Sequence, residues 1–259
     1  MSSIKRVLLN YKQKYKTKIV LSFTTSPTRI QYVPYLLDAL NVNIFDNIYI
    51  NIPKQFDRTP TLKYKIPKFT QKNVIINKIA DDLGPATKIL PILDQFKNDP
   101  NMIVVSIDDD IKISKKPDVL TKLVIECIQS NCVITGIGKN LSHWNLSSNK
   151  ISSSRKPYVD IIEGWTGVAY KPSMIDIDFC VKMINASSYC KLSDDLVLSW
   201  GIRKQGFKIK SLMLSTSLFK ELFWGLGNDA IHYGAGSKNP NKHIQAHYYN
   251  YAKCFKKLL

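Results

Sequence analysis

The chain has 259 residues, of which 44% are hydrophobic and 22% are charged, which is ample for one large α/β domain with a packed core. No apolar run approaches the roughly 20 residues of a membrane span. The formal net charge of +17 suits a nucleic acid, an anionic membrane surface or a phosphorylated substrate. Because the lysines are spread along the whole chain, however, charge alone does not indicate dedicated nucleic-acid binding.

The N-terminus, together with the lack of a membrane span, predicts a cytoplasmic protein. The first ten residues hold no apolar core long enough for a secretory signal. The cysteines are odd in number and show no Cys-x-x-Cys spacing, which argues against a zinc cluster or a disulfide framework. We therefore expect buried, reduced thiols at Cys127, Cys132, Cys180, Cys190 and Cys254.

Residues 1–17 form a basic arm ahead of a domain that we place at 18–259. Apolar and aromatic residues recur in the arm at near-helical spacing, which predicts a short helix lying on the domain. Its lysines also allow a peripheral contact with a membrane surface.

The first strand is predicted at 18–24, followed by a hydroxyl-rich turn and a helix with its apolar face at 30–40. Ser/Thr before a periodic apolar pattern, with Pro near the first turn, is typical of a helix start. A helix N-terminus at the end of a strand can bind an anion or a nucleotide. Ordinary capping by Thr25 or Ser26 explains the same residues equally well.

Two more strands and a helix follow. Residues 48–52 and 74–76 read as strands, residues 53–72 as a surface excursion, and residues 86–96 as a helix after a Gly-Pro break. The next strand, at 102–107, runs directly into Asp108, Asp109 and Asp110. Ligands bind at the carboxyl edge of open α/β sheets, and adjacent carboxylates suit a hard cation with substrate phosphates. A solvated acidic turn is the alternative.

The second half of the chain alternates helical and strand patterns, with two polar segments. Its predicted elements are a helix at 117–130, a strand at 132–135, a mobile Ser/Asn-rich loop at 140–155, a strand at 158–162, helices at 174–184 and 193–206, a strand at 207–211, a flexible flap at 225–242 and a basic helix at 244–259.

These motifs in this order resemble the GT-A fold glycosyltransferases, in particular those similar to family 2, over roughly residues 18 to 250. The residues that carry the resemblance are the turn after the first strand, Asp81-Asp82-x-Gly-Pro-Ala-Thr-Lys88, the Asp-x-Asp motif at 108–110, the aromatic glycine segment at 163–170, and Ser193-Asp-Asp-Leu196. The resemblance implies a single Rossmann-like α/β domain with a mostly parallel central sheet flanked by helices.

The resemblance also implies a function. Such an enzyme is a metal-dependent, inverting transferase that moves a sugar from a nucleotide-diphosphate sugar, foremost a UDP-sugar, to a hydroxyl of a carbohydrate or glycoconjugate acceptor. Mn²⁺ or Mg²⁺ would neutralise the diphosphate leaving group. Asp110 would hold the ion, with Asp108 directly or through water, and His232 would complete the site. A structural role for His232 is the alternative.

A carboxylate must accept the proton of the acceptor hydroxyl. Asp195 is the first candidate for this base and Asp194 the second. The pair is Asp-Asp rather than the more usual Glu-Asp, so the resemblance leaves open which of the two is the base. Two carboxylates that only stabilise a helix start are the alternative.

The resemblance places further residues around the donor. Asp81 or Asp82 would meet the base or ribose, and Lys88 the diphosphate, unless it is a solvated helix lysine. Trp165 and Thr166 would face the sugar and acceptor, with a core position as the alternative for Trp165. The remaining nucleotide-sugar residues are Thr24, Thr25, Arg29, Asp108 and Asp109.

Two other functions fit parts of the pattern. A sugar-nucleotide pyrophosphorylase would need a glycine-rich, Arg-containing loop after the first strand, and residues 24–29 contain no glycine. A basic nucleic-acid-binding protein would gather basic residues on one face without acids, and two separate aspartate clusters count against it.

Overall fold

The computed structural model describes residues 3–145, 150–153, 156–222 and 240–258. The helices are α1 (Ser3–Tyr15), α2 (Val33–Ala39), α3 (Leu90–Gln95), α4 (Val119–Ser130), α5 (Ile177–Ala186), α6 (Ser188–Lys191), α7 (Asp194–Lys204) and α8 (Pro240–Leu258). The strands are β1 (Lys18–Thr24), β2 (Asn47–Pro53), β3 (Val74–Ile79), β4 (Met102–Ser106), β5 (Ile111–Ile113), β6 (Val133–Thr135), β7 (Gly138–Asn145), β8 (Lys150–Ser153), β9 (Tyr158–Val159), β10 (Ile161–Ile162), β11 (Val168–Tyr170), β12 (Ile209–Ser211) and β13 (Phe219–Glu221).

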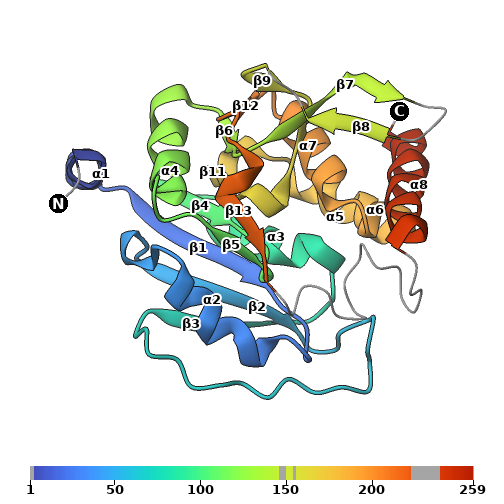
Figure 1. Cartoon of the computed structure of the whole chain (residues 1–259), viewed down its shortest axis with the longest axis horizontal. Coiled ribbons are helices and arrows are strands. Elements are labelled where there is room, and N and C mark those ends of the chain that lie inside the picture. The colour runs from blue at the N-terminus through green and yellow to red at the C-terminus, as the bar shows by residue number, and fades with distance from the viewer. Residues whose placement is uncertain (1–2, 146–149, 154–155, 223–239, 259) are drawn as a thin grey trace.

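The described residues build one central eight-stranded sheet in the order β3-β2-β1-β4-β11-β6-β12-β9 (Figure 1). Only β11 and β9 run against the direction of the other strands in this sheet. Central strands such as β1 and β4 are mostly apolar and almost fully buried because both faces of a parallel sheet are covered. The predicted α/β class, with a mostly parallel central sheet flanked by helices, is confirmed.

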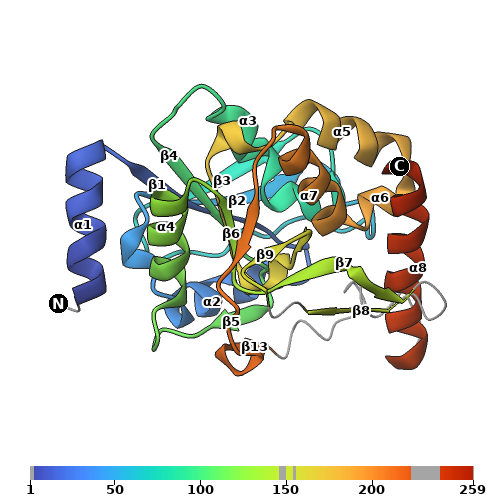
Figure 2. The same cartoon turned by 90° about the horizontal axis from the view of Figure 1, so that it is seen from above.

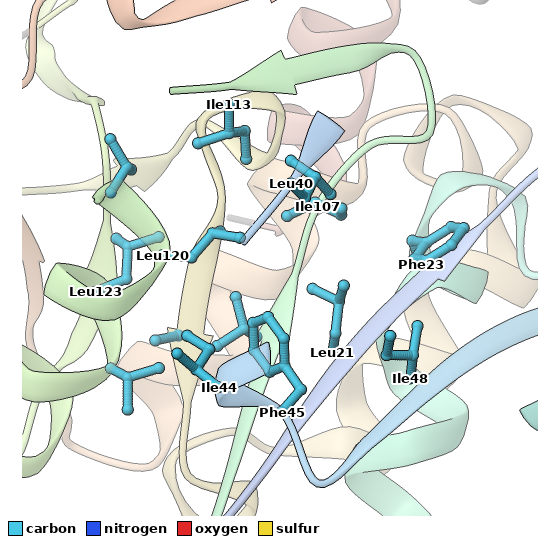
Figure 3. Packing of buried hydrophobic residues seen from close by; sticks show 14 of the residues in the cluster. Leu21, Phe23, Leu40, Ile44, Phe45, Ile48, Ile107, Ile113, Leu120 and Leu123 are labelled. Atoms are coloured by element: carbon cyan, nitrogen blue, oxygen red, sulfur yellow. The ribbon is translucent and has the colours of Figure 1, made fainter. Parts of the chain in front are cut away.

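Side chains from the two faces of the sheet enter separate hydrophobic cores. One core joins β1, β2 and β4 to α2 and α4, and Figure 3 shows Leu21, Phe23 and Ile48 packed there. The other core joins the opposite face to α3, α5, α7 and α8. Burying a side chain such as Phe23 or Leu21 fully contributes about 1.5–3 kcal/mol. The two cores together fix the sheet whose carboxyl edge carries the candidate site.

Helices α1 and α8 lie at opposite ends of the long axis (Figures 1 and 2). The predicted N-terminal helix is present as α1, which packs on α4 through the buried Leu8. The predicted C-terminal helix begins earlier than expected, at Pro240. Within the part of the chain that the structure describes, no helix is both long and apolar enough to cross a membrane.

The prediction of a mobile loop at 140–155 is wrong for its described part. Strands β7 and β8 pair there as an antiparallel hairpin, and β7 also pairs with β10. The Ser/Asn-rich composition suggested a loop, but pairing with a neighbouring strand overrides weak local preference. The strand predicted at 158–162 is divided at Asp160, whose carboxylate accepts the N–H of Leu141. The predicted flap at 225–242 lies outside the described residues except for its last three positions, which belong to α8.

The expectation that every cysteine is reduced is also wrong. Cys190 of α6 and Cys254 of α8 form a disulfide, with their Cα atoms 4.7 Å apart. The partners are 64 residues apart in the sequence, and only the packing of α8 against α6 brings them together. Cys127, Cys132 and Cys180 are buried free thiols, as expected.

Candidate active site

The carboxyl ends of β1, β2 and β4 meet at one edge of the sheet, beneath the turn that follows β1. The structure corrects the predicted helix start in this turn. The N–H groups of Arg29 and Ile30 both donate to the carbonyl of Ser26, and a 3₁₀ turn at Ile30–Tyr32 precedes α2. Because the first turn is 3₁₀, Arg29, and not the N-terminus of α2, lies next to the aspartates that follow β4.

Arg29 joins the turn after β1 to the aspartates after β4. Its guanidinium lies 3.1 Å from Oδ1 of Asp109 and 2.8 Å from Oδ2 of Asp110. Burial raises the pKa of Asp109 to about 7, against the opposing effect of Arg29. The predicted nucleotide residue Arg29 and the predicted metal ligand Asp110 are therefore neighbours in space.

Asp82 braces the loop that carries Lys88. Its Oδ2 accepts the N–H of Asp57 and its Oδ1 accepts the N–H of Gly84. Gly84 has φ +64°, and a Cβ there would lie 2.5 Å from the carbonyl oxygen of Lys191, so this turn requires glycine. Both Asp82 oxygens accept hydrogen bonds from the chain itself, which gives this residue a structural role in the loop.

Lys88 ends this loop, a 3₁₀ helix at Gly84–Lys88, and is 4% exposed. Its Nζ lies 2.8 Å from Oδ1 of Asp108 and 3.0 Å from Oδ2 of Asp194. Burial lowers the pKa of Lys88, but the surrounding aspartates raise it more, so that it lies well above the usual range. A solvated helix lysine is therefore excluded, and the ammonium is a buried cation between two acids.

The predicted acidic pair lies at the first turn of α7. Oδ1 of Asp195 accepts a 3.1 Å hydrogen bond from the backbone N–H of Gly164. Burial and the adjacent Asp194 raise the pKa of Asp195 well above its usual range, although Lys88 opposes them. Ser193 precedes the helix but makes no capping hydrogen bond through its side chain. The site thus brings the two predicted aspartate clusters together around Lys88.

Several predicted donor residues lie elsewhere or are fully used by the fold. The hydroxyl of Thr166 is buried and donates to the carbonyl of Glu163, so it does not face a sugar. Trp165 packs edge-on against Phe219, 5.3 Å between ring centroids, at the margin of a hydrophobic core. Asp81 is exposed and lines a separate cavity of about 500 Å³ beside α3 and α5.

Thr24 and Thr25 remain at the predicted edge of the sheet. The hydroxyl of Thr24 donates to the carbonyl of Asn51, and the carbonyl of Thr25 accepts the hydroxyl of Tyr64. Both contacts hold the turn after β1 in place. Tyr64 comes from the surface excursion between β2 and β3, which therefore reaches the site.

The carboxylates of this edge fit a hard cation only together with a substrate. Among the described residues, no three His, Cys, Asp or Glu side chains are grouped to hold a metal. Mg²⁺, however, is commonly held by one or two carboxylates together with substrate phosphates and water. Asp110 offers such oxygens beside Arg29, whereas Oδ1 of Asp108 faces Lys88. The predicted ligand His232 lies outside the described residues.

Two residues that shape the site, Gly164 and Asn51, were not identified from the sequence patterns. Gly164 contacts both Lys88 and Asp195, since an added Cβ would lie 2.6 Å from Nζ and 2.7 Å from Oδ1. Asn51 interrupts an apolar strand, and its buried amide bonds Ser22 and the carbonyl of Lys88. A polar residue inside a fully buried strand was the available signal for Asn51, because buried amides need partners.

Comparison with known proteins adds little. No protein-family model matches the sequence, and no curated protein matches it. Among solved structures, the chain is similar to the crystal structure of S. aureus TarS 1–349, with a TM-score of 0.44 and 12% sequence identity. The match covers 93% of this chain and 72% of that one. A likeness of this degree carries no argument about activity, which has to come from the residues themselves.

Proposed function

We propose that this protein is a glycosyltransferase that moves a sugar from a nucleotide-diphosphate sugar to an acceptor hydroxyl with inversion. The observation that carries the proposal is the meeting of Asp108, at the end of β4, with Asp194 and Asp195, at the start of α7, around the buried Lys88. Transfer needs acids for two tasks, donor binding and proton removal, and this edge of the sheet supplies both.

Asp195 is the proposed base. The N–H of Gly164 holds its Oδ1, which leaves Oδ2 to take the proton of an acceptor hydroxyl. Its raised pKa makes it a stronger base than an ordinary aspartate. For inversion, the base must lie on the face of the sugar opposite the leaving group, as in an inverting glycosidase. Asp194 remains the second candidate, but its carboxylate already forms an ion pair with Lys88.

The donor would bind between the turn after β1 and the aspartates after β4. Asp110 would hold Mn²⁺ or Mg²⁺, with Asp108 beside it, and Arg29 would meet the phosphates. A divalent ion, when bound, supplies positive charge to the departing diphosphate. A UDP-sugar is the first donor to test, and a carbohydrate or glycoconjugate the acceptor.

Neither alternative function gains support. The two aspartate clusters converge on one edge, so acids are present where a nucleic-acid-binding face would lack them.

A location in the cytoplasm is opposed by the disulfide between Cys190 and Cys254, since disulfides are typical of oxidising compartments.

The experiment is a thermal-shift panel of nucleotide-sugars with and without Mn²⁺. A ligand at a hundred times its Kd stabilises the folded state by about 2.7 kcal/mol, so the right donor raises the melting temperature selectively. Asp110→Ala should abolish the Mn²⁺-dependent part of the shift. Asp94→Ala, at an exposed aspartate paired with Lys97, should keep it. A panel with no selective shift contradicts the proposed donor class, and an Mn²⁺-dependent shift in Asp110→Ala contradicts the metal assignment.

A further inference from the structure

Lys88 connects two parts of the site that come from distant segments of the chain. Its ammonium contacts Asp108 after β4 and Asp194 at the start of α7, at 2.8 and 3.0 Å. The edge of the sheet and the helix that carries the proposed base therefore meet at this one ammonium.

The backbone of Lys88 is held as firmly as its side chain. Its carbonyl accepts hydrogen bonds from the hydroxyl of Ser22 on β1, at 2.6 Å, and from the amide of Asn51 on β2, at 3.2 Å. The start of the same 3₁₀ helix is braced by Asp82. A buried charge is costly to desolvate, so it needs partners that are held in place. The ammonium of Lys88 has two acids as partners, and the hydrogen bonds to its carbonyl fix the backbone that carries it.

Gly164 completes the arrangement on the other side. The space that its missing side chain leaves is filled by Nζ of Lys88 and Oδ1 of Asp195, each within 2.7 Å of where a Cβ would lie. Its N–H also donates to Asp195. Lys88, Gly164 and the first turn of α7 thus fit against one another, and a displacement of the ammonium would move the turn that carries Asp195.

We propose that Lys88 is a positioning residue for sugar transfer, which acts through Asp194 to hold the first turn of α7, and with it Asp195, at a fixed place beside the donor. This inference rests on the proposed function and deepens it. Asp194, engaged by Lys88, serves as the anchor of the helix, and Asp195 serves as the base. In this role Lys88 holds α7 in place and is not a primary contact of the diphosphate, since two acids already surround its ammonium.

The kinetic test compares Lys88→Met with Lys210→Met. Lys210, on β12, also pairs with an acid, Glu126 of α4 at 2.6 Å, but this pair lies away from the site. Misplacement of a catalytic group by about 1 Å can cost roughly 100-fold in rate. We expect Lys88→Met to lower kcat roughly 10- to 100-fold while donor KM changes less than about threefold, and Lys210→Met to keep both. Unchanged kcat, or a loss confined to KM as expected of a diphosphate contact, overturns the proposal.

A double variant tests whether Lys88 acts through Asp194. Asp194→Asn keeps the size of the side chain but removes its charge. The kcat of the double variant Lys88→Met with Asp194→Asn should be no lower than that of the slower single variant. Losses that multiply in the double variant contradict the proposal. If Lys88→Met does not fold, Asp194→Asn alone serves as the test. Its kcat should fall while its donor KM stays nearly unchanged.

A measurement of stability separates this inference from the proposed function. Denaturant unfolding of the same variants should show non-additive effects for Lys88→Met and Asp194→Asn, and additive effects for Lys210→Met and Asp194→Asn. Additive effects in the first pair contradict the bridge whatever the activity. If the stability effects are coupled but the wild-type protein neither binds nor uses any nucleotide-sugar, the proposed function is contradicted. The interaction between Lys88 and Asp194 is still supported by that result.

Discussion

The backbone N–H of Gly164 donates a 3.1 Å hydrogen bond to Oδ1 of Asp195. This bond joins the segment before β11 to the first turn of α7, and it leaves room for no side chain. The absence of a Cβ at Gly164 lets both Asp195 and Lys88 approach. The orientation of the proposed base therefore depends on a glycine that takes no part in the proton transfer itself.

The first prediction concerns Gly164→Ala. Its Cβ would lie within 2.7 Å of Lys88 and Asp195, so the side chains must shift and transfer should fall roughly 100-fold. Gly206→Ala is the control, because Gly206 has φ +76° but open space around it. The control should lose about 1 kcal/mol of unfolding free energy from backbone strain and keep its transfer rate. Transfer assays with denaturant unfolding check both, and an active Gly164→Ala variant argues against the geometry.

The second prediction separates the two acids of α7. Asp195→Asn keeps the size of the side chain but cannot accept a proton, and should lower transfer by roughly 10²–10⁴-fold with donor binding near normal. Asp194→Asn should cost only about tenfold, because it loosens the anchor to Lys88 but leaves the carboxylate of Asp195 itself intact. Side chains of adjacent helical residues point about 100° apart, so the two acids cannot both occupy the same catalytic position. The opposite order of the two rates would make Asp194 the base.

The third prediction is a pH profile of kcat/KM. Only ionised Asp195 can accept the proton, and burial and Asp194 raise its pKa well above the usual range. A raised pKa leaves less of the ionised form at a given acidic pH, so transfer should fall on acidification at a pH well above about 3.9, the ordinary value for aspartate. Asp195→Asn should lack this acidic limb. A wild-type rate that is constant down to about pH 4 would show that no such base is in use.

The fourth prediction concerns the disulfide between Cys190 and Cys254. Closing a loop of this length stabilises the folded state by about 4 kcal/mol in the chain-entropy model, because it restricts the unfolded chain. Cys254→Ser should therefore lower the free energy of unfolding by several kcal/mol, and a reductant should do the same to the wild type. Cys132→Ala, at a free thiol, is the control. Equal stability with and without reductant would mean that the bond contributes nothing.

The sequence by itself determined the class of the fold and pointed to the acids of the candidate site. Mostly apolar runs such as 102–107 identify buried strands without any tertiary information, because a strand covered on both faces is rich in apolar residues. Asp108 to Asp110 and Asp194-Asp195 were recognisable because each follows a strand or opens a helix. Local pattern is enough for such elements, since it depends only on neighbouring residues.

Only the tertiary structure decided which of these residues meet and what each one does. Lys88 and Asp82 belong to one short motif, yet Lys88 bridges two acids while Asp82 braces its own loop. The disulfide and the hairpin of β7 and β8 likewise depend on contacts between distant segments. Burial, ion pairing and strand pairing are set by the packing of the whole chain, and a single sequence carries no record of which distant residues come into contact.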